Sequence, residues 1–267
     1  MEYYEAARVN THPAMVAAAI EAFRSVGARE VIVAEGPGHR RDTEILLEQS
    51  GLSDALSHER AKFVDLNLDS IHPIKLRSNY TRLGRLFFPD TVLGADLVVS
   101  MPKLKTHHWA GATLSLKNMF GTVPGVKYGW PKNLLHWRGI PQSIVDINVA
   151  LNPGFAIIDG IEGMEGDGPL RGDTVASAVI IMGDNLTAVD ATGARAMGFV
   201  PERMTYLQAM QAHGGVLDEK QILQLGEPIA AVRRDFRVLE HLSNLKQTAM
   251  HRPHGDESLY RGKYLMC

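Results

Sequence analysis

The sequence predicts an α/β protein of three layers, in which helices flank a largely parallel sheet and an irregular C-terminal extension follows. Short continuous apolar runs, typical of strands covered on both faces, alternate with segments of helical apolar spacing. Strands that alternate with helices favour parallel pairing. We therefore expect an α/β domain over residues 1–226. A more charged, less periodic extension is expected over residues 227–267.

Helices and strands are expected to alternate along the chain. Pro13 suits the first turn of a helix that Asn10 or Thr11 would cap, and Gly27 lies just past its end. Asp42 or Thr43 would cap a second helix. Further helices are expected over residues 140–151 and 186–197. The apolar runs predict strands at residues 30–34, 62–66, 95–100, 155–159 and 178–182.

Composition excludes several classes of function. The chain has 267 residues, a formal net charge of -2 and ordinary hydrophobic content, so no basic field favours nucleic acid or an anionic membrane. No apolar run spans a bilayer and no signal peptide is visible, so we expect a cytoplasmic protein. The single cysteine, Cys267, excludes an iron–sulfur cluster or a Cys-ligated zinc site held within this chain.

Polar turns follow four of the predicted strands: EGPGHRRD, MPKLKTHH, DGIEGMEGDGP and GDN. Ligands of parallel sheets lie beyond the carboxyl ends of the strands, so these turns are expected to share one rim. Gly36 and Gly38 of the first turn would then allow close approach of a ligand. Asp184 of the fourth turn is expected nearby. One turn is cationic and another acidic, and we expect these two to face each other across a pocket.

The cationic turn predicts an anion site. Lys103 and Lys105 alternate in sequence, so an extended backbone would point both the same way. Thr106 would cap a short helix that carries Lys117 and Asn118, and the helix N-terminus would itself attract an anion. We expect Lys103, Lys117 and Asn118 to bind the substrate, which would be a carboxylate or a phosphate.

Three histidines in or near this turn have candidate roles. Neighbouring lysines would depress the pKa of His107 and keep it neutral, so we expect it to be a catalytic acid or base together with Lys105. A metal at His107 or His108 is the weaker interpretation, because adjacent residues of an extended segment diverge. His136, beside Trp137, belongs either to a lid or to a surface loop.

The acidic turn supplies Asp159, Glu162 and Glu165. These carboxylates would either bind a divalent cation such as Mg²⁺ or pair with the lysine turn, and the residues alone do not separate the two interpretations. Asp190 lies in a helix of small and apolar residues. A buried carboxylate there needs a partner, either a rim lysine or the N-terminus of a neighbouring helix.

Several motifs together resemble a known family. PKLKTH, SLKNMFG, the Asp159-Gly160 pair followed by MEGDGP, and GDNLTAVDATGARAMG occur in the order found in the prokaryotic domain of unknown function 362. The earlier NTHPAMVAAAIEAFRSVGAREVIVAEGPG fits it as well, so the resemblance covers about residues 10–225. It implies an α/β domain with clustered motif residues and no established common reaction. Many relatives carry an iron–sulfur module, which Cys267 alone cannot hold.

The start of the chain departs from that family's pattern. Relatives usually begin with a strand that carries a Lys-Pro-Asn motif, and here only residues 1–9 precede the NTHP segment. The first strand is therefore expected to be missing: either the start of the chain is truncated or another element fills that position in the sheet. An unpaired sheet edge would result and would favour a homodimer.

The expected function is that of an enzyme or cofactor-binding protein with a Lys/His and Asp/Glu site for an anionic small molecule, with or without a divalent cation. The alternative is a non-catalytic redox-partner or assembly module. An enzyme site should be concave and partly dry, with groups of perturbed pKa. An interaction module should instead show a flatter apolar patch around Trp109, Phe120, Trp130 and Trp137.

Overall fold

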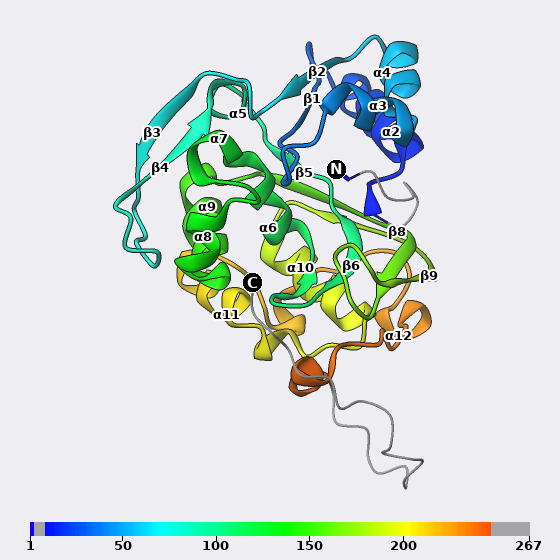
Figure 1. The fold of residues 1–267 in the computed structure, drawn as a ribbon. Coiled ribbons are helices and arrows are strands. Elements are labelled where there is room, and N and C mark those ends of the chain that lie inside the picture. The colour runs from blue at the N-terminus through cyan, green and yellow to red at the C-terminus, as the bar shows by residue number, and fades with distance from the viewer. Residues whose placement is uncertain (3–8, 247–267) are drawn as a thin grey trace, which may run out of the picture.

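A computed structural model describes residues 1–2 and 9–246 of the chain, and its strands belong to three sheets (Figure 1). The N-terminal part contains a parallel pair of strands, β1 and β2, with helices around it. Its elements are α2 (Pro13–Ser25), β1 (Ile32–Glu35), α3 (Thr43–Ser50), α4 (Leu52–Glu59) and β2 (Lys62–Asp65). Pro13 occupies the first turn of α2 as expected. The capping residue, however, is His12, whose Nδ1 accepts from the Ala14 N–H at 3.1 Å.

The central sheet has five strands arranged around β8. They are β5 (Val99–Ser100), β6 (Lys103–His107), β7 (Gly111–Thr113), β8 (Phe155–Glu165) and β9 (Asp173–Gly183). Both β5 and β6 run parallel to β8 along one of its edges, and β9 runs antiparallel along the other. β7 then pairs antiparallel with β6. A separate antiparallel pair, β3 (Ile71–Lys75) and β4 (Arg85–Pro89), completes the strands of the described residues.

Helices cover both faces of this sheet, so the predicted three-layer α/β class is confirmed. Side chains alternate along β8. Ala156 and Ile158 face the main core, and Ile157 packs beneath α2. The Phe155 and Phe23 rings make an edge contact at 6.1 Å on that α2 face. The helices on the main-core side include α6 (Ser115–Asn118), α9 (Ile140–Leu151), α10 (Leu186–Ala196) and α11 (Thr205–Met210).

Short helices lie in the connections. They are α5 (Asp90–Leu93), α7 (Gly125–Tyr128), α8 (Asn133–Trp137) and α12 (Ile229–Val232), with the 3-10 helix η1 (Met119–Thr122) after α6. In the part of the chain that the structure describes, no helix combines the length and apolar character needed to cross a bilayer.

The direction of β9 corrects one expectation. Gly183, the last residue of β9, lies opposite Ala156 near the start of β8 because the two strands are antiparallel. The turn that carries Asp184 therefore lies at the opposite end of the sheet from the ends of β6 and β8. Asp184 is exposed there and does not line the cavity described below.

Strands β1 and β5 each leave one edge unpaired among the described residues. A cavity of about 1020 Å³ lies between them, and residues of both strands, including Val33 and Val99, line it. α2 contributes Phe23 to the same walls, and η1 contributes Met119.

The predicted C-terminal extension is described as far as residue 246, and it packs against the α/β domain. Phe236 and Leu245 are buried in the main core. Lys246 forms an isolated bridge with Phe199, and Arg237 pairs with Glu165 of β8. This part of the extension is therefore continuous with the domain. Cys267 lies outside the described residues.

Candidate functional site

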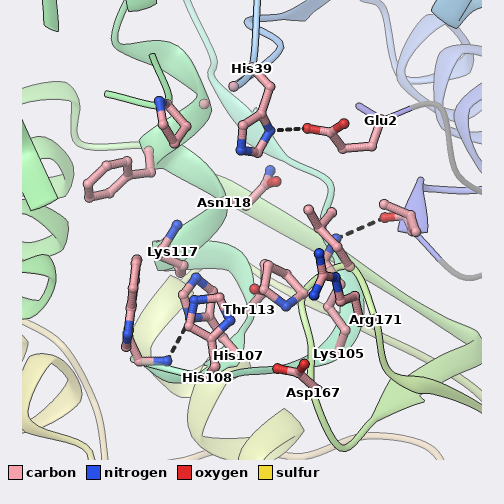
Figure 2. Close-up of a pocket in the computed structure, with 18 of the residues that line it drawn as sticks. Glu2, His39, Lys105, His107, His108, Thr113, Lys117, Asn118, Asp167 and Arg171 are labelled. Carbon is pink, nitrogen blue, oxygen red and sulfur yellow. Dashed lines mark hydrogen bonds and ion pairs between the residues drawn. The ribbon is translucent and has the colours of Figure 1, made fainter. Parts of the chain in front are cut away.

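A cavity of about 1260 Å³ lies where β6 and α6 meet the end of β1, helix α8 and the turn after β8 (Figure 2). Its lining contains the cationic side chains Lys105, Lys117, Lys132 and Arg171 and the imidazoles of His39, His107, His108, His136 and His241. The carboxylates on its walls are those of Glu2, Glu35, Asp167 and Glu240. The site is thus concave and contains ionisable groups of both signs.

The segment predicted as a cationic turn is strand β6, and its two lysines differ in role. Lys105 lines the cavity and donates from Nζ to the Val9 carbonyl at 2.9 Å. Lys103 is buried and donates to Asp159 Oδ2 at 2.9 Å. The pairing of β6 with β8 shifts register between these two lysines, which breaks simple alternation. Lys103 is therefore a structural ion-pair partner, a correction to its predicted substrate-binding role.

His107 follows on β6 and lines the same cavity as a neutral ring. Its Nδ1 accepts the backbone N–H groups of Trp109 at 3.1 Å and Ala110 at 3.2 Å, so its proton resides on Nε2. Burial, and next the charge of Lys117, hold the pKa of His107 well below its usual range. Because its lone pair is already engaged, His107 is a hydrogen-bond donor. The geometry does not support the expected general base.

Helix α6 positions Lys117 and Asn118, and Asp190 of α10 fixes that helix. The Asp190 carboxylate accepts the N–H of Ser115 at 2.7 Å and the N–H of Leu116 at 3.0 Å, and it also accepts the Ser115 hydroxyl. Of the two partners predicted for Asp190, the helix N-terminus is the one observed. Burial nevertheless raises the pKa of Asp190 to about 7.

Two expectations about this helix are wrong. Leu114, and not Thr106, precedes its first residue. Thr106 is instead part of β6, and its hydroxyl donates to the Gly166 carbonyl at 3.0 Å. The N–H groups at the start of α6 are occupied by Asp190, so they are not an anion site. Asn118 lines the cavity and donates to the Ser100 hydroxyl at 3.2 Å.

Lys117 enters the cavity from α6. Its Nζ lies 4.4 Å from the centre of the Phe120 ring. Burial, and then the positive charges of Lys132 and Lys105, lower the pKa of Lys117 to about 7. Burial also lowers the pKa of Lys105 to about 8, against the opposing charges of Glu35 and Glu2.

Lys132 is a cavity residue that sequence reasoning missed. Its Nζ donates to the carbonyls of Gly36, Phe120 and Gly121, each at 3.1 Å, and so joins the end of β1 to η1. Burial lowers the pKa of Lys132 to about 8, which Glu35 partly opposes. The only sequence signal was a lysine in a Gly- and Pro-rich segment. Arg171, in the turn after β8, was missed as well.

The glycines of the first turn line the cavity as predicted, but they have different surroundings. A Cβ on Gly36 would lie 2.5 Å from the Gly121 carbonyl oxygen, so this backbone approach requires glycine. A Cβ on Gly38 would meet only Pro131, at 3.8 Å. Gly36 therefore brings η1 against β1, close to Lys132.

Glu35 and Glu2 bring negative charge to the same end of the cavity. The Met1 ammonium donates to Glu35 at 2.9 Å. Burial alone would raise the pKa of Glu35, but the charges of Met1, Lys132 and Lys105 outweigh burial and lower it. Glu2 pairs with His39 and accepts from Arg41 at 2.9 Å.

The acidic segment is mostly strand β8, and this corrects the predicted metal site. Asp159 is fully buried and accepts from Lys103 and from the His12 N–H, whereas Glu165 pairs with Arg237 at 2.5 Å. Glu162 pairs across the sheet with Ala176. In residues 1–2 and 9–246 no group of three His, Cys, Asp or Glu side chains is placed to hold a metal. Ion pairing is the alternative that the contacts support.

The basic and acidic segments are neighbours, as expected, but through direct pairing. β6 and β8 are adjacent strands, and of the carboxylates in the acidic segment only Asp167, in the turn after β8, lines the cavity. His136 of α8 also lines the cavity. Its Nδ1 lies 3.0 Å from the Lys132 carbonyl oxygen, and burial lowers its pKa.

The fold and site define a three-layer α/β protein with a lysine- and histidine-lined cavity beside a mixed central sheet. A family model described as a domain of unknown function (DUF362) matches residues 1–195, and the chain belongs to this family. The resemblance stated from the motifs is thereby confirmed.

One curated relative is the thylakoid-associated protein sll1697 of Synechocystis sp. (strain ATCC 27184 / PCC 6803 / Kazusa). It is 30% identical over 118 residues, which cover 42% of this chain and 34% of that protein. The matched part of this chain thus spans about a third of the relative's length.

Proposed function

We propose that this protein binds a small anion, a carboxylate or a phosphate, in the lysine-lined cavity, and that it acts on this molecule as an enzyme. One observation carries the proposal. Lys105 and Lys132 donate only to backbone carbonyls, and Lys117 contacts only an aromatic ring, among the described residues. Their positive charges therefore lack a carboxylate at ion-pair distance, and desolvated ammonium groups are costly without one.

An anion in the cavity would supply the missing negative charge. Lys105 and Arg171 both line the walls, and a guanidinium suits the two oxygens of a carboxylate or phosphate. The Nε2–H of His107 is available as a neutral donor to a ligand oxygen. Because an anion favours the charged form of each amine, binding should raise the lowered pKa values of Lys105 and Lys117 and take up protons near pH 7–8.

The non-catalytic alternative, a redox-partner or assembly module, receives less support from the geometry. Its expected flat apolar patch is not continuous, because Phe120 is buried and Trp130 packs over Gly125. Trp109 and Trp137 are exposed, at 63% and 81%. A concave site with several groups of lowered pKa fits a ligand-binding or catalytic role better.

The test is anion binding by calorimetry with inorganic phosphate and oxalate as probes. We expect Lys105→Ala to abolish binding and to leave the melting temperature nearly unchanged. Lys127→Ala, which removes a lysine outside the cavity, should keep both. Wild-type titrations in buffers of different ionisation enthalpy should report proton uptake.

Two outcomes would count against the proposal. Wild-type protein that takes up neither probe, and that co-purifies with no small anion by mass spectrometry, would remove it. A fall of many degrees in the melting temperature of Lys105→Ala would assign Lys105 a structural role.

We also propose a ligand, a cellular compartment and an oligomeric state for this protein. A small anionic molecule is the proposed ligand, and the cytoplasm is the proposed compartment. A homodimer is proposed through the unpaired edges of β1 and β5, because free strand edges favour pairing between chains.

A further inference from the structure

We propose that Lys117 is a nucleophilic amine that forms an imine with the carbonyl carbon of an oxo acid bound in the cavity. This inference rests on the proposed anion site and narrows its ligand to a molecule that carries both a carboxylate and an aldehyde or ketone. An imine-forming lysine needs a free Nζ, a neutral form near pH 7 and a nearby group that holds the substrate.

Lys117 is the lysine of the cavity whose Nζ is not engaged by a hydrogen-bond acceptor among the described residues. Lys132 is saturated by three carbonyl oxygens, and Lys105 is held by the Val9 carbonyl. Lys117 contacts only the face of Phe120, at 4.4 Å. Its amine can therefore reach a ligand without first losing a protein partner.

The surroundings of Lys117 favour the neutral amine. The charged groups that act on it are Lys132, from the turn before α8, and Lys105, from β6. The rings of His107 and His136, on β6 and α8, line the same cavity and have lowered pKa values themselves. With burial as the largest cause, the pKa of Lys117 falls to about 7.

In this environment the fraction of neutral amine is far larger for Lys117 than for a surface lysine. At pH 7 about half of the Lys117 amines are neutral, compared with roughly one in 3000 for a lysine at the ordinary value of 10.5. The free amine is the species that attacks a carbonyl carbon. Desolvation and cationic neighbours together are a recognised way to activate a lysine.

Other cavity groups can bind the carboxylate and the carbonyl oxygen of an oxo acid. Arg171 and Lys105 would hold its carboxylate, and His107 Nε2–H would donate to the carbonyl oxygen. The Lys117 nitrogen adds to the carbonyl carbon, and the two hydrogens of the neutral amine leave with the carbonyl oxygen as water. The product is a C=N bond to Lys117, with no change of oxidation state and no further reactant.

The experiment traps this bond by reduction. Full-length protein is mixed at pH 7 with glyoxylate or pyruvate, and sodium borohydride then reduces the imine to a stable secondary amine. Intact-mass measurement and peptide mapping locate the adduct. We expect one adduct per chain, on Lys117, at least 100-fold enriched over any surface lysine at low probe concentration. Its yield should rise with pH around a midpoint near 7.

Variants separate this inference from the proposed function. Lys117→Arg removes the nucleophilic amine and leaves a cation in the cavity, so it should lose the adduct, whereas Lys127→Arg, outside the cavity, should keep both the adduct and phosphate binding. Phosphate binding by the wild type with adducts spread evenly over surface lysines would overturn the imine and leave the anion site intact. A selective Lys117 adduct without phosphate binding would support the imine and restrict the ligand to carboxylates. Protein that binds neither phosphate nor oxo acid would refute both.

Discussion

The buried ion pair of Lys103 and Asp159 allows the sharpest test of whether Lys103 has a structural role and Lys105 a ligand-binding role. Lys103 is 3% exposed and Asp159 is 0% exposed, and their Nζ and Oδ2 atoms lie 2.9 Å apart. Asp159 also accepts the N–H of His12 at 2.9 Å and that of Ile161 at 3.2 Å. The pair therefore joins β6, β8 and the start of α2.

Lys103→Met removes the cation and leaves a buried carboxylate without a countercharge. Removing one partner of a buried pair costs about 3–5 kcal/mol of folding free energy. At about 2–4 °C per kcal/mol for a chain of this size, the melting temperature should fall by about 6–20 °C. The exposed strand residue Lys62 is the matched control, and Lys62→Met should shift the melting temperature by little.

A double variant tests the charge directly. In the Lys103→Met background, Asp159→Asn removes the buried negative charge that has lost its countercharge, and the amide oxygen can still accept from the His12 N–H. The free energy of unfolding lost by the double variant should therefore be smaller than the sum of the losses of the two single variants, by about 0.5–3 kcal/mol. Urea unfolding followed by circular dichroism measures the wild type, the two single variants, the double variant and the Lys62→Met control. If Lys103→Met unfolds like Lys62→Met, the buried pair does not stabilise the fold and the division of roles between Lys103 and Lys105 is wrong.

Two further predictions concern the frame of the cavity. Gly36→Ala should cost about 1–3 kcal/mol, because its Cβ would lie 2.5 Å from a backbone oxygen, whereas Gly38→Ala should be nearly neutral by the same unfolding measurement. Equal effects would contradict the close approach at Gly36. Burial raises the pKa of Asp190 from 3.8 to about 7, so its contribution to stability is fully present below pH 4 and is lost as the pH rises through 7. Wild-type stability relative to Asp190→Asn should therefore fall between about pH 4 and pH 7, and a flat difference would refute the raised pKa.

Much of the site could be predicted because strand ends are local features. Apolar runs followed by glycine-bearing polar turns placed Gly36, Lys105 and His107 near one rim, and all three line the cavity. Helical spacing likewise placed Asp190 in a helix with a need for a partner, which the start of α6 supplies. The motif order also identified the family, as the match over residues 1–195 shows.

Other predictions failed because they depended on strand direction and register. The antiparallel direction of β9 moves Asp184 to the far end of the sheet. The extension of β8 through Glu165 converts a supposed acidic loop into a strand, on which Asp159 pairs with Lys103 and Glu165 pairs with Arg237. Arg171 and Lys132 carry no local pattern that marks them as cavity residues.

The sequence by itself determined the α/β class, the family and the neighbourhood of the site, because periodicity and turn chemistry are encoded within a few residues. The tertiary structure decided which lysine amines are engaged by protein acceptors and which one can reach a ligand. Lys103 meets Asp159, Lys132 meets three carbonyls, and Lys117 meets only Phe120. Asp159 and Gly36 lie far along the chain from the lysines that they contact, so the local pattern around each lysine does not reveal its partner.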